Sequence, residues 1–400
     1  MEIDGKPKKL SWRDLEVLTD SFSKENFIVN VQFGKLYRGK TPDAQELTVK
    51  IRWLPPDEVC TIVLCDDAIV DRLERELSVL TNPDLGNHPN LVKLIGYCCE
   101  DQGSHYGVVY DVRSKDSLLN LIEKDDFTWT QRMQAALGVA RVLEHLHERN
   151  YLVCNVHPAH VILDQDSNPV LLDFSLRPDR TIAKRYPNYP CTVYYGYDGY
   201  IDPLFVHNGI ASLSCANVRV THGHCNFWVN ACNVNNSVFT VVELLGCKSL
   251  LELQFYFSFW VKRADVFSFG IVLLELITKF VFDQSKCDAA REFPAGWAQR
   301  QYRQKLNSSS QPVGCLLVHK SFDSAPDFDV CDGVAITKLA VHCVDLDERK
   351  RPTMTQIVNY LQGIIDEWDT QSTEETAGKK KNSNAENERK SLLPLFDHED

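Results

Sequence analysis

The stretch Tyr151-Leu-Val-Cys-Asn-Val-His-Pro-Ala-His-Val-Ile-Leu-Asp164, followed by Leu171-Leu-Asp-Phe-Ser-Leu176, decides how this chain folds. Apolar residues fill most of both segments, and Asn155, His160 and Asp173 are polar residues within them. The Asn155 amide has no basic lone pair that could accept a proton. A neutral imidazole such as that of His160 is a poor ligand for Mg²⁺, which prefers oxygen. Asn155 and His160 are therefore badly suited to proton transfer and to magnesium binding.

Helical patterns lie on both sides of this stretch. Thr128-Trp-Thr-Gln131 fits a capping box, and apolar residues then recur at helical spacing as far as Leu146. We expect a buried helix there that leads the chain into the stretch. From Pro352, a residue suited to the first helical position, a second apolar stripe continues to Trp368. That stripe predicts core packing rather than a cofactor site.

A strand pattern is visible nearer the start of the chain. Glu46-Leu-Thr-Val-Lys-Ile51 alternates in polarity, which places Lys50 on the opposite face from Val49 and Ile51. A lone Lys is usually a surface charge, so the pattern by itself gives Lys50 a position and no role.

Composition excludes several classes of protein. The chain has 400 residues, 44% hydrophobic and 24% charged, which is ample for a two-lobed core and a tail. A net charge of -12 disfavours nucleic-acid binding. The 14 Cys are scattered and no signal peptide opens the chain, so we expect a reduced, cytoplasmic protein. Met1-Glu2 lacks the Gly for myristoylation, and no uncharged run is long enough to span a membrane. Any membrane association should therefore arise through a partner.

Motifs along most of the chain occur in the order of one family. The segments concerned are Ser11-Trp-Arg-Asp-Leu-Glu-Val-Leu-Thr-Asp-Ser-Phe22, His88-Pro-Asn-Leu-Val-Lys-Leu-Ile-Gly-Tyr-Cys98, Gly199-Tyr-Ile-Asp-Pro203, Asp265-Val-Phe-Ser-Phe-Gly-Ile-Val-Leu-Leu-Glu275 and Arg351-Pro-Thr-Met354. With the opening stretch, this set resembles the catalytic domain of plant receptor-like Ser/Thr protein kinases, of the receptor-like cytoplasmic kind. The resemblance implies an α+β, bilobal protein-kinase fold with a β-rich N-lobe and a helical C-lobe.

The resemblance also gives expected boundaries. Residues 1–21 form a lead-in segment, 22–112 the N-lobe and 113–368 the C-lobe. Beyond Asp369 the sequence turns polar, which predicts a disordered tail over 369–400.

The catalytic loop of these kinases follows H-R-D-x-x-x-x-N, in which the Asp accepts the substrate hydroxyl proton and the Asn helps to hold a second magnesium. In the implied register Asn155 stands at that Asp, His157 at the family's usual Lys and His160 at the Asn. The chain therefore resembles a degenerate kinase, a pseudokinase.

The nucleotide site is partly kept in the same register. Lys50 falls at the Lys that contacts the ATP phosphates, Glu76 at its helix partner and Asp173 at the magnesium-binding Asp, and Tyr110 is expected in the nucleotide site. Ser175 replaces the Gly of Asp-Phe-Gly, and Ser tolerates positive φ poorly. ATP and Mg²⁺ are thus the implied cofactors.

The phosphate-covering loop is altered. Val29 and Val31 stand at the first two glycines of the family's loop, which leaves only Gly34. Close backbone approach to phosphate needs glycine, and β-branched side chains obstruct it. We therefore expect ATP to bind weakly. Thr48 replaces a small Ala beside the adenine.

The substrate side departs from the family too. Tyr197 stands where the family keeps a Thr that contacts the catalytic Asp. Leu204 follows Asp202-Pro203 where a Glu normally pairs with the Arg matched by Arg351. A buried Arg without its carboxylate costs several kcal/mol, so the C-lobe is either locally rearranged or opened to water near the insert. The alternative is that Arg351 is simply exposed.

About fifty extra residues, from Ile210 to Trp260, stand where the family has a short connector. They are nearly uncharged, which favours a retained intron or gene-model error over an evolved, folded element. The group His222, His224, Cys225 and Cys232 lacks paired C-x-x-C spacing, so we expect no structural metal.

Three hypotheses follow for function. The first is a pseudokinase that acts as a scaffold or regulator of partner kinases or receptor complexes in plant signalling or immunity. The second is a weakly active Ser/Thr kinase that uses unorthodox residues. The third is a degenerate gene product whose insert prevents folding. Loss of a general base alone costs about 10²–10⁴-fold in rate, and this loss favours the first hypothesis.

Overall fold

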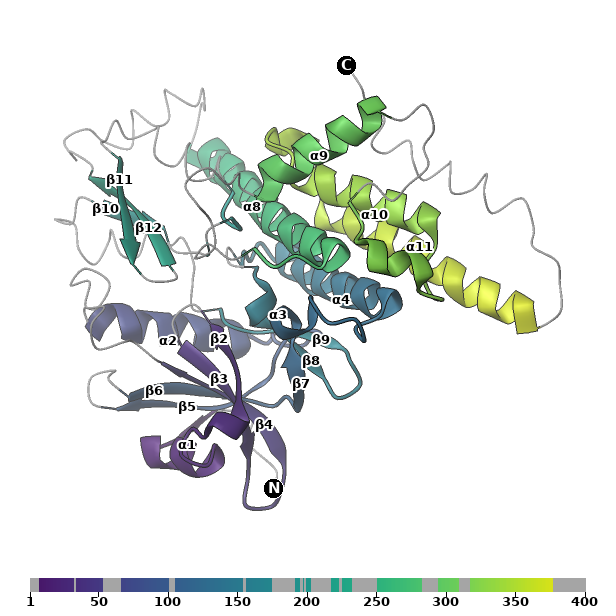
Figure 1. The fold of residues 1–400 in the computed structure, drawn as a ribbon. Coiled ribbons are helices and arrows are strands. Elements are labelled where there is room, and N and C mark those ends of the chain that lie inside the picture. Colours follow the sequence, from purple (N-terminus) through teal and green to yellow (C-terminus); the bar gives the residue numbers. More distant parts are fainter. Residues whose placement is uncertain are drawn as a thin grey trace.

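The computed structural model describes residues 7–31, 34–52, 66–100, 105–153, 156–174, 191–194, 197, 199–202, 217–222, 225–231, 250–282, 294–308 and 317–376. A sheet-rich lobe lies at one end, and a bundle of helices forms the other (Figure 1). The expectation of an α+β, bilobal fold with a β-rich N-lobe and a helical C-lobe is confirmed.

The elements of the first lobe are β1 (Lys8–Lys9), α1 (Trp12–Leu18), η1 (Lys24–Asn26), β2 (Phe27–Val31), β3 (Gly34–Lys40), β4 (Glu46–Arg52), α2 (Asp66–Leu80), β5 (Leu94–Glu100) and β6 (His105–Tyr110). The next elements are β7 (Ser114–Ser117), α3 (Leu118–Leu121), α4 (Trp129–Glu148), η3 (Pro158–His160), β8 (Val161–Asp164), β9 (Pro169–Leu171) and β10 (Cys191–Tyr194). The remaining elements are β11 (Asn217–His222), β12 (Cys225–Ala231), α8 (Leu250–Thr278), α9 (Pro294–Ser308), η5 (Lys320–Ser324), α10 (Val330–Cys343), η6 (Glu348–Lys350) and α11 (Met354–Thr376).

The N-lobe sheet has six strands in the order β1-β5-β6-β4-β3-β2. The central strand β4 is covered on both faces, because successive side chains of a strand point to opposite sides. Val49 and Ile51 belong to a small cluster that includes Leu15 of α1, on the outer face. Lys50 points to the other face, as its place in the strand pattern predicted. That face turns toward α2 and the C-lobe.

The lead-in segment folds as α1, which packs against β5 and β6. Ser11 caps α1: its hydroxyl accepts from the Asp14 N–H, and the Asp14 carboxylate accepts from the Ser11 N–H. Such reciprocal bonds satisfy two donors that a helix start otherwise leaves open. Leu15 is fully buried, so α1 is an integral part of the N-lobe.

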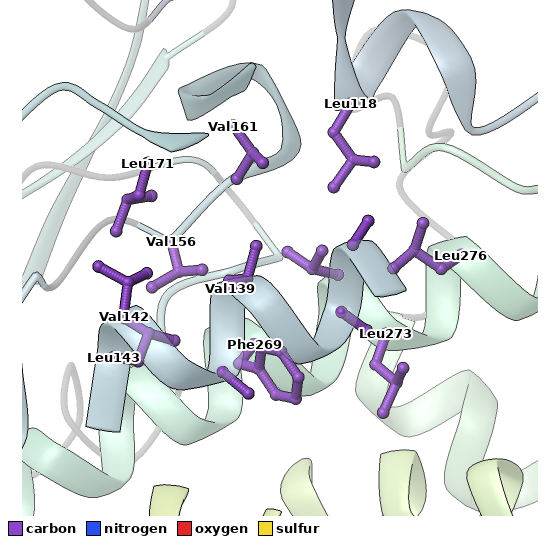
Figure 2. Packing of buried hydrophobic residues seen from close by; sticks show 14 of the residues in the cluster. Leu118, Val139, Val142, Leu143, Val156, Val161, Leu171, Phe269, Leu273 and Leu276 are labelled. Carbon is purple, nitrogen blue, oxygen red and sulfur yellow. The ribbon is translucent and has the colours of Figure 1, made fainter. Parts of the chain in front are cut away.

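Helix α4 forms the centre of the C-lobe and packs against α8 and α11. Its start has the capping box that the sequence predicted, between Thr128 and Gln131. Figure 2 shows Val139 of α4 on the side of Val156 and Leu171, and Phe269 of α8 on the opposite side of α4. The apolar stripe of α4 therefore packs between helix α8 and strand β9.

The last helix differs from its prediction at both ends. It begins at Met354, and Thr353 and Gln356 exchange capping bonds, so Pro352 lies before the cap and not at the first helical position. It continues to Thr376, past the boundary predicted at Asp369. Residues 377–400 lie outside the described residues, and their disorder stays a prediction.

The predicted insert is described in part. Strands β11 and β12 pair antiparallel, and β12 also pairs with β10, which precedes the insert. Helix α8 begins at Leu250, so it runs through the boundary expected at Trp260. The zinc candidates His224 and Cys232 lie outside the described residues. Of the helices in the described ranges, none is apolar over a length sufficient to cross a membrane.

Candidate nucleotide and catalytic site

The site is built around a buried ion pair between β4 and α2. The Lys50 ammonium donates to the Glu76 carboxylate, and Lys50 is 4% exposed and Glu76 0%. Two tyrosine hydroxyls from β6 also donate to Glu76: that of Tyr110, and that of Tyr106 at 3.2 Å. Glu76 thus receives three donors, which hold α2 against the sheet.

Asp173 joins this cluster from the C-lobe side. Its Oδ1 lies 3.0 Å from the Lys50 Nζ, and its side chain is 2% exposed. The backbone of Asp173 has φ +66°, a left-handed conformation that Asp adopts more readily than most residues. Lys50 is therefore shared by two buried carboxylates from different lobes.

The cluster holds one more carboxylate than it has lysines. Burial by itself would lower the pKa of Lys50, but Asp173 and Glu76 outweigh burial and hold that pKa well above its ordinary value. Burial also raises the pKa of Glu76, and Asp173 raises it further, against the opposing effect of Lys50. Because the excess negative charge lies in a buried place, the cluster favours an additional cation. The Asp173 carboxylate is an oxygen ligand that fits Mg²⁺.

His160 alters the second metal position. It is the last residue of η3 and fully buried, and its Nε2 lies 3.5 Å from Asp173 Oδ2. A ring nitrogen thus lies against the carboxylate where the resemblance predicted an amide oxygen. Mg²⁺ prefers oxygen ligands, so the residues do not fit a second magnesium.

His157 is locked in an aromatic stack. Its ring lies 3.6 Å from that of Tyr197, at an interplanar angle of 12°, and the Tyr200 ring packs on it edge-on at 4.4 Å. The Ala159 N–H donates to His157 Nδ1 at 3.1 Å, which assigns the ring hydrogen to Nε2. Burial and, after it, His160 hold the pKa of His157 well below its ordinary value. A neutral His157 brings no positive charge to the family's Lys position.

Helix α8 anchors the catalytic segment, the stretch from Tyr151 to Asp164, at Val153. Asp265 Oδ2 accepts from the Val153 N–H at 3.0 Å and lies 2.9 Å from His147 Nε2. Asp265 is fully buried. Sequence reasoning did not assign His147 to this anchor, and only its position near the end of α4 could have indicated it. Asn155 itself lies outside the described residues, as does Ser175, so the predictions made for both remain predictions.

The two valines at glycine positions are buried in β2. Val29 is 4% exposed and Val31 6%, and both belong to the main hydrophobic cluster that runs into the C-lobe. At Gly34 the packing of the sheet, and not only the approach of a phosphate, requires glycine. A Cβ at Gly34 would lie 2.2 Å from the carbonyl oxygen of Ile51, so the close approach of β3 to β4 excludes any side chain there. Thr48 is also buried, and its hydroxyl donates to the Val112 carbonyl at 2.9 Å.

Arg351 is neither exposed nor opened to water, and a different carboxylate from the one the family uses pairs with it. It is 1% exposed, so it is not a surface residue. It also has a carboxylate: Asp202 Oδ1 lies 3.1 Å from its Nη2, and Oδ2 accepts from its Nη1. The carbonyls of Asp345 and Arg263 accept at 2.7 and 3.0 Å. Asp202, two positions before Leu204, thus supplies the bidentate partner that the family places at Leu204.

The comparisons with known proteins agree with this geometry. Residues 23–190 match the family model "Protein tyrosine and serine/threonine kinase", so the part of the chain that carries the Lys50–Glu76–Asp173 cluster matches a protein kinase domain.

The relatives are plant receptor-like and receptor-like cytoplasmic Ser/Thr kinases. Among them are the receptor-like cytosolic serine/threonine-protein kinase RBK2 of Arabidopsis thaliana (25% identical, covering 90% of this chain and 62% of that protein) and the LRR receptor kinase SERK2 of Oryza sativa subsp. japonica (25%, covering 91% and 50%). A third is the EPD1-interacting receptor-like cytoplasmic serine/threonine-protein kinase 5A of Gossypium barbadense (27%, covering 88% and 63%). The chain therefore spans half to just under two thirds of the length of these three relatives.

Proposed function

We propose that this chain is a pseudokinase, a signalling protein with a protein kinase domain that acts through binding rather than phosphotransfer. The observation that carries the proposal is the position of His160, whose imidazole lies 3.5 Å from Asp173. A kinase that stabilises phosphoryl transfer with two magnesium ions needs hard oxygen ligands in that place. Without a second magnesium, the transferred phosphoryl group is less well positioned and its charge is less well stabilised. Positioning and charge stabilisation supply most of the catalysis in this reaction.

The stack of His157 on Tyr197 supports the proposal independently. The resemblance places Tyr197 beside the catalytic base, where a small Thr is expected. The Tyr197 ring instead covers His157 at 3.6 Å, with Tyr200 against the same ring. An aromatic stack of this kind leaves less room for a substrate hydroxyl, and small displacements of reacting groups are costly to the rate.

We assign the chain a role as a scaffold or regulator of partner kinases or receptor complexes in plant signalling or immunity. The relatives' names include receptor kinases and a kinase described as EPD1-interacting, which supports a place in receptor signalling. We place the protein in the cytoplasm, with any membrane association arising through a partner.

Nucleotide binding is proposed to survive weakly. Lys50 would contact the phosphates and Asp173 would hold one Mg²⁺, which neutralises phosphate charge when it is bound. Val29 and Val31 limit the affinity, because their buried side chains replace the backbone contact that glycine allows. Binding should stabilise the fold by mass action, so a thermal shift at millimolar ATP–Mg²⁺ measures it.

A weakly active Ser/Thr kinase is the alternative function. The observation in its favour is the intact cluster, in which Lys50 contacts Glu76 and lies 3.0 Å from Asp173. An active protein kinase requires the ion pair that Lys50 and Glu76 form, and it requires an Asp at the position of Asp173 to hold Mg²⁺.

Incorporation of labelled phosphate into a generic protein substrate decides between the two functions. The blank is Lys50→Arg, which keeps a buried cation between the two carboxylates. The pseudokinase proposal expects equal, background incorporation from the unmodified chain and the blank. Clear incorporation that the Lys50→Arg variant loses would establish the weak kinase instead.

A further inference from the structure

Strand β2 lies against the catalytic segment rather than apart from it. It is packed on η3, which ends in His160, and on β7. Figure 1 shows β2 at the side of the sheet that faces α3 and the C-lobe strands. The region between β2 and η3 is where the resemblance places the nucleotide, so two elements that would enclose ATP already contact each other.

Side chains of β2 belong to the hydrophobic core that continues into the C-lobe. Val29 and Val31 belong to the same continuous hydrophobic cluster as Leu118 of α3 and Leu163 of β8. Burying a valine side chain stabilises the arrangement that buries it, relative to one that leaves it exposed. Moving β2 away from the C-lobe to admit a nucleotide would forfeit part of this burial, so the closed arrangement has its own stabilisation.

One hydrogen bond joins β2 directly to the C-lobe. The Asn120 side-chain amide, on α3, donates to the Ile28 carbonyl at 2.9 Å and to Asp116 Oδ1 at 2.7 Å. The Ser117 hydroxyl accepts from the Asn120 N–H and holds α3 in place. The Asn120 side chain of the C-lobe is therefore hydrogen-bonded to the Ile28 carbonyl of the N-lobe. Asn120 is not part of the Lys50–Glu76–Asp173 cluster.

We propose that β2, held by Asn120, is a latch that keeps this domain closed, and that ATP binds only the form in which the latch is open. The inference rests on the proposed weak nucleotide binding and names its regulation. In the closed form, Val29 and Val31 are buried in the core in the absence of a ligand. Nucleotide binding therefore competes with the closed form. The measured affinity for ATP is reduced by the fraction of molecules that are open.

The test is the substitution of Asn120, because it removes the latch without touching the Lys50 cluster. Asn120→Ala should bind ATP–Mg²⁺ about two- to tenfold more tightly, from the loss of one net hydrogen bond of the closed form. Its unfolding temperature without nucleotide should fall at the same time. Asn120→Asp, whose carboxylate cannot donate to Ile28, should behave in the same way.

The control is Asp116→Ala, which removes the other acceptor of the Asn120 amide and leaves its bond to Ile28. This variant should keep the ATP affinity of the unmodified chain. Calorimetric titration measures the affinities, and a thermal scan measures stability. Lower stability in both Asn120 variants with unchanged or weaker ATP binding, or no binding in any variant at millimolar ATP, would overturn the latch. Phosphate incorporation plays no part in this readout, so a kinase-active chain would disprove the pseudokinase proposal and leave the latch result interpretable.

Discussion

The two halves of the candidate site have been altered to different extents. On the N-lobe side, Lys50 and Glu76 form the buried pair of a protein kinase, and Asp173 completes it. On the catalytic segment, imidazoles occupy positions 157 and 160, and His157 is stacked on Tyr197. The first half joins Lys50 and Glu76 of the N-lobe to Asp173 of the C-lobe. Under the proposed function it would also contact phosphate, whereas the second half would have lost its part in phosphotransfer.

This difference has a physical reason. Removing one partner from a buried ionic cluster leaves an uncompensated charge, which costs several kcal/mol of folding stability. Replacing a residue that only accepts a proton or ligates a metal costs rate and little stability. A chain that keeps its fold but not its chemistry should therefore retain Lys50, Glu76 and Asp173 and change the catalytic loop, which is the pattern found.

The largest effect is expected at Lys50. The Lys50→Met substitution leaves Glu76 and Asp173 buried without their cation, and it should lower the free energy of unfolding by about 3–5 kcal/mol. Urea titration measures the change. Lys93→Met is the matched control, since Lys93 is exposed, and it should change stability by no more than about 0.5 kcal/mol. Equal, small changes in both variants would break the contrast between the two halves.

A somewhat smaller effect is expected at Asp202. Asp202→Ala removes the carboxylate of buried Arg351, but the carbonyls of Asp345 and Arg263 still accept from the guanidinium. We expect a loss of about 3 kcal/mol in unfolding free energy. Adding Leu204→Glu should recover part of the loss, because it returns a carboxylate to the family's position.

Asp166→Ala, at an exposed aspartate, is the control for this pair and should have little effect. If the double variant Asp202→Ala/Leu204→Glu is no more stable than Asp202→Ala alone, the idea that Asp202 has taken over the function of the family's Glu fails.

A pH dependence of stability is expected from Glu275. Burial raises its pKa to about 8, against the lowering effect of the Tyr200 hydroxyl and the Phe282 N–H. The unfolded chain has a carboxyl near the ordinary value of 4.5, so the folded protein binds more protons between pH 4.5 and about 8. The free energy of unfolding therefore falls as the pH rises through this window.

Glu275→Gln keeps an acceptor for Tyr200 and Phe282 and removes the titration. Unfolding temperatures measured from pH 5 to 8 should decline less in this variant than in the unmodified chain. Glu123→Gln, at an exposed position, should follow the unmodified chain. Parallel curves for all three proteins would remove Glu275 as the cause.

The sequence predicted the ionic half of the site better than its surroundings. Strand alternation alone placed Lys50 opposite Val49 and Ile51, and the family register joined it to Glu76 and Asp173. These positions depend on local periodicity and motif order, which a sequence carries directly. The capping box at Thr128 and Gln131 was predicted for the same reason.

Contacts between segments that are far apart in the sequence were harder to predict. The pairing of Asp202 with Arg351 joins residues 149 apart in the chain. A register that assigned the role to position 204 could not reveal that a carboxylate two residues earlier reaches the same guanidinium. The exclusion of a side chain at Gly34 by the Ile51 carbonyl, and the bond from Asn120 to Ile28, likewise depend on tertiary packing.

The most direct test of the central claim is a restoration series for phosphotransfer. Asn155→Asp supplies the missing proton acceptor at similar volume. It is compared with a variant that also carries Val29→Gly, Val31→Gly, His160→Asn and Tyr197→Thr, and each is measured by incorporation of labelled phosphate against a Lys50→Arg blank. We predict that Asn155→Asp alone stays at background and that the combined variant shows Lys50-dependent activity, because metal binding, phosphate cover and substrate access are separate defects. Activity restored by Asn155→Asp alone, or already present in the unmodified chain, would contradict the claim that the catalytic half of the site has lost its function.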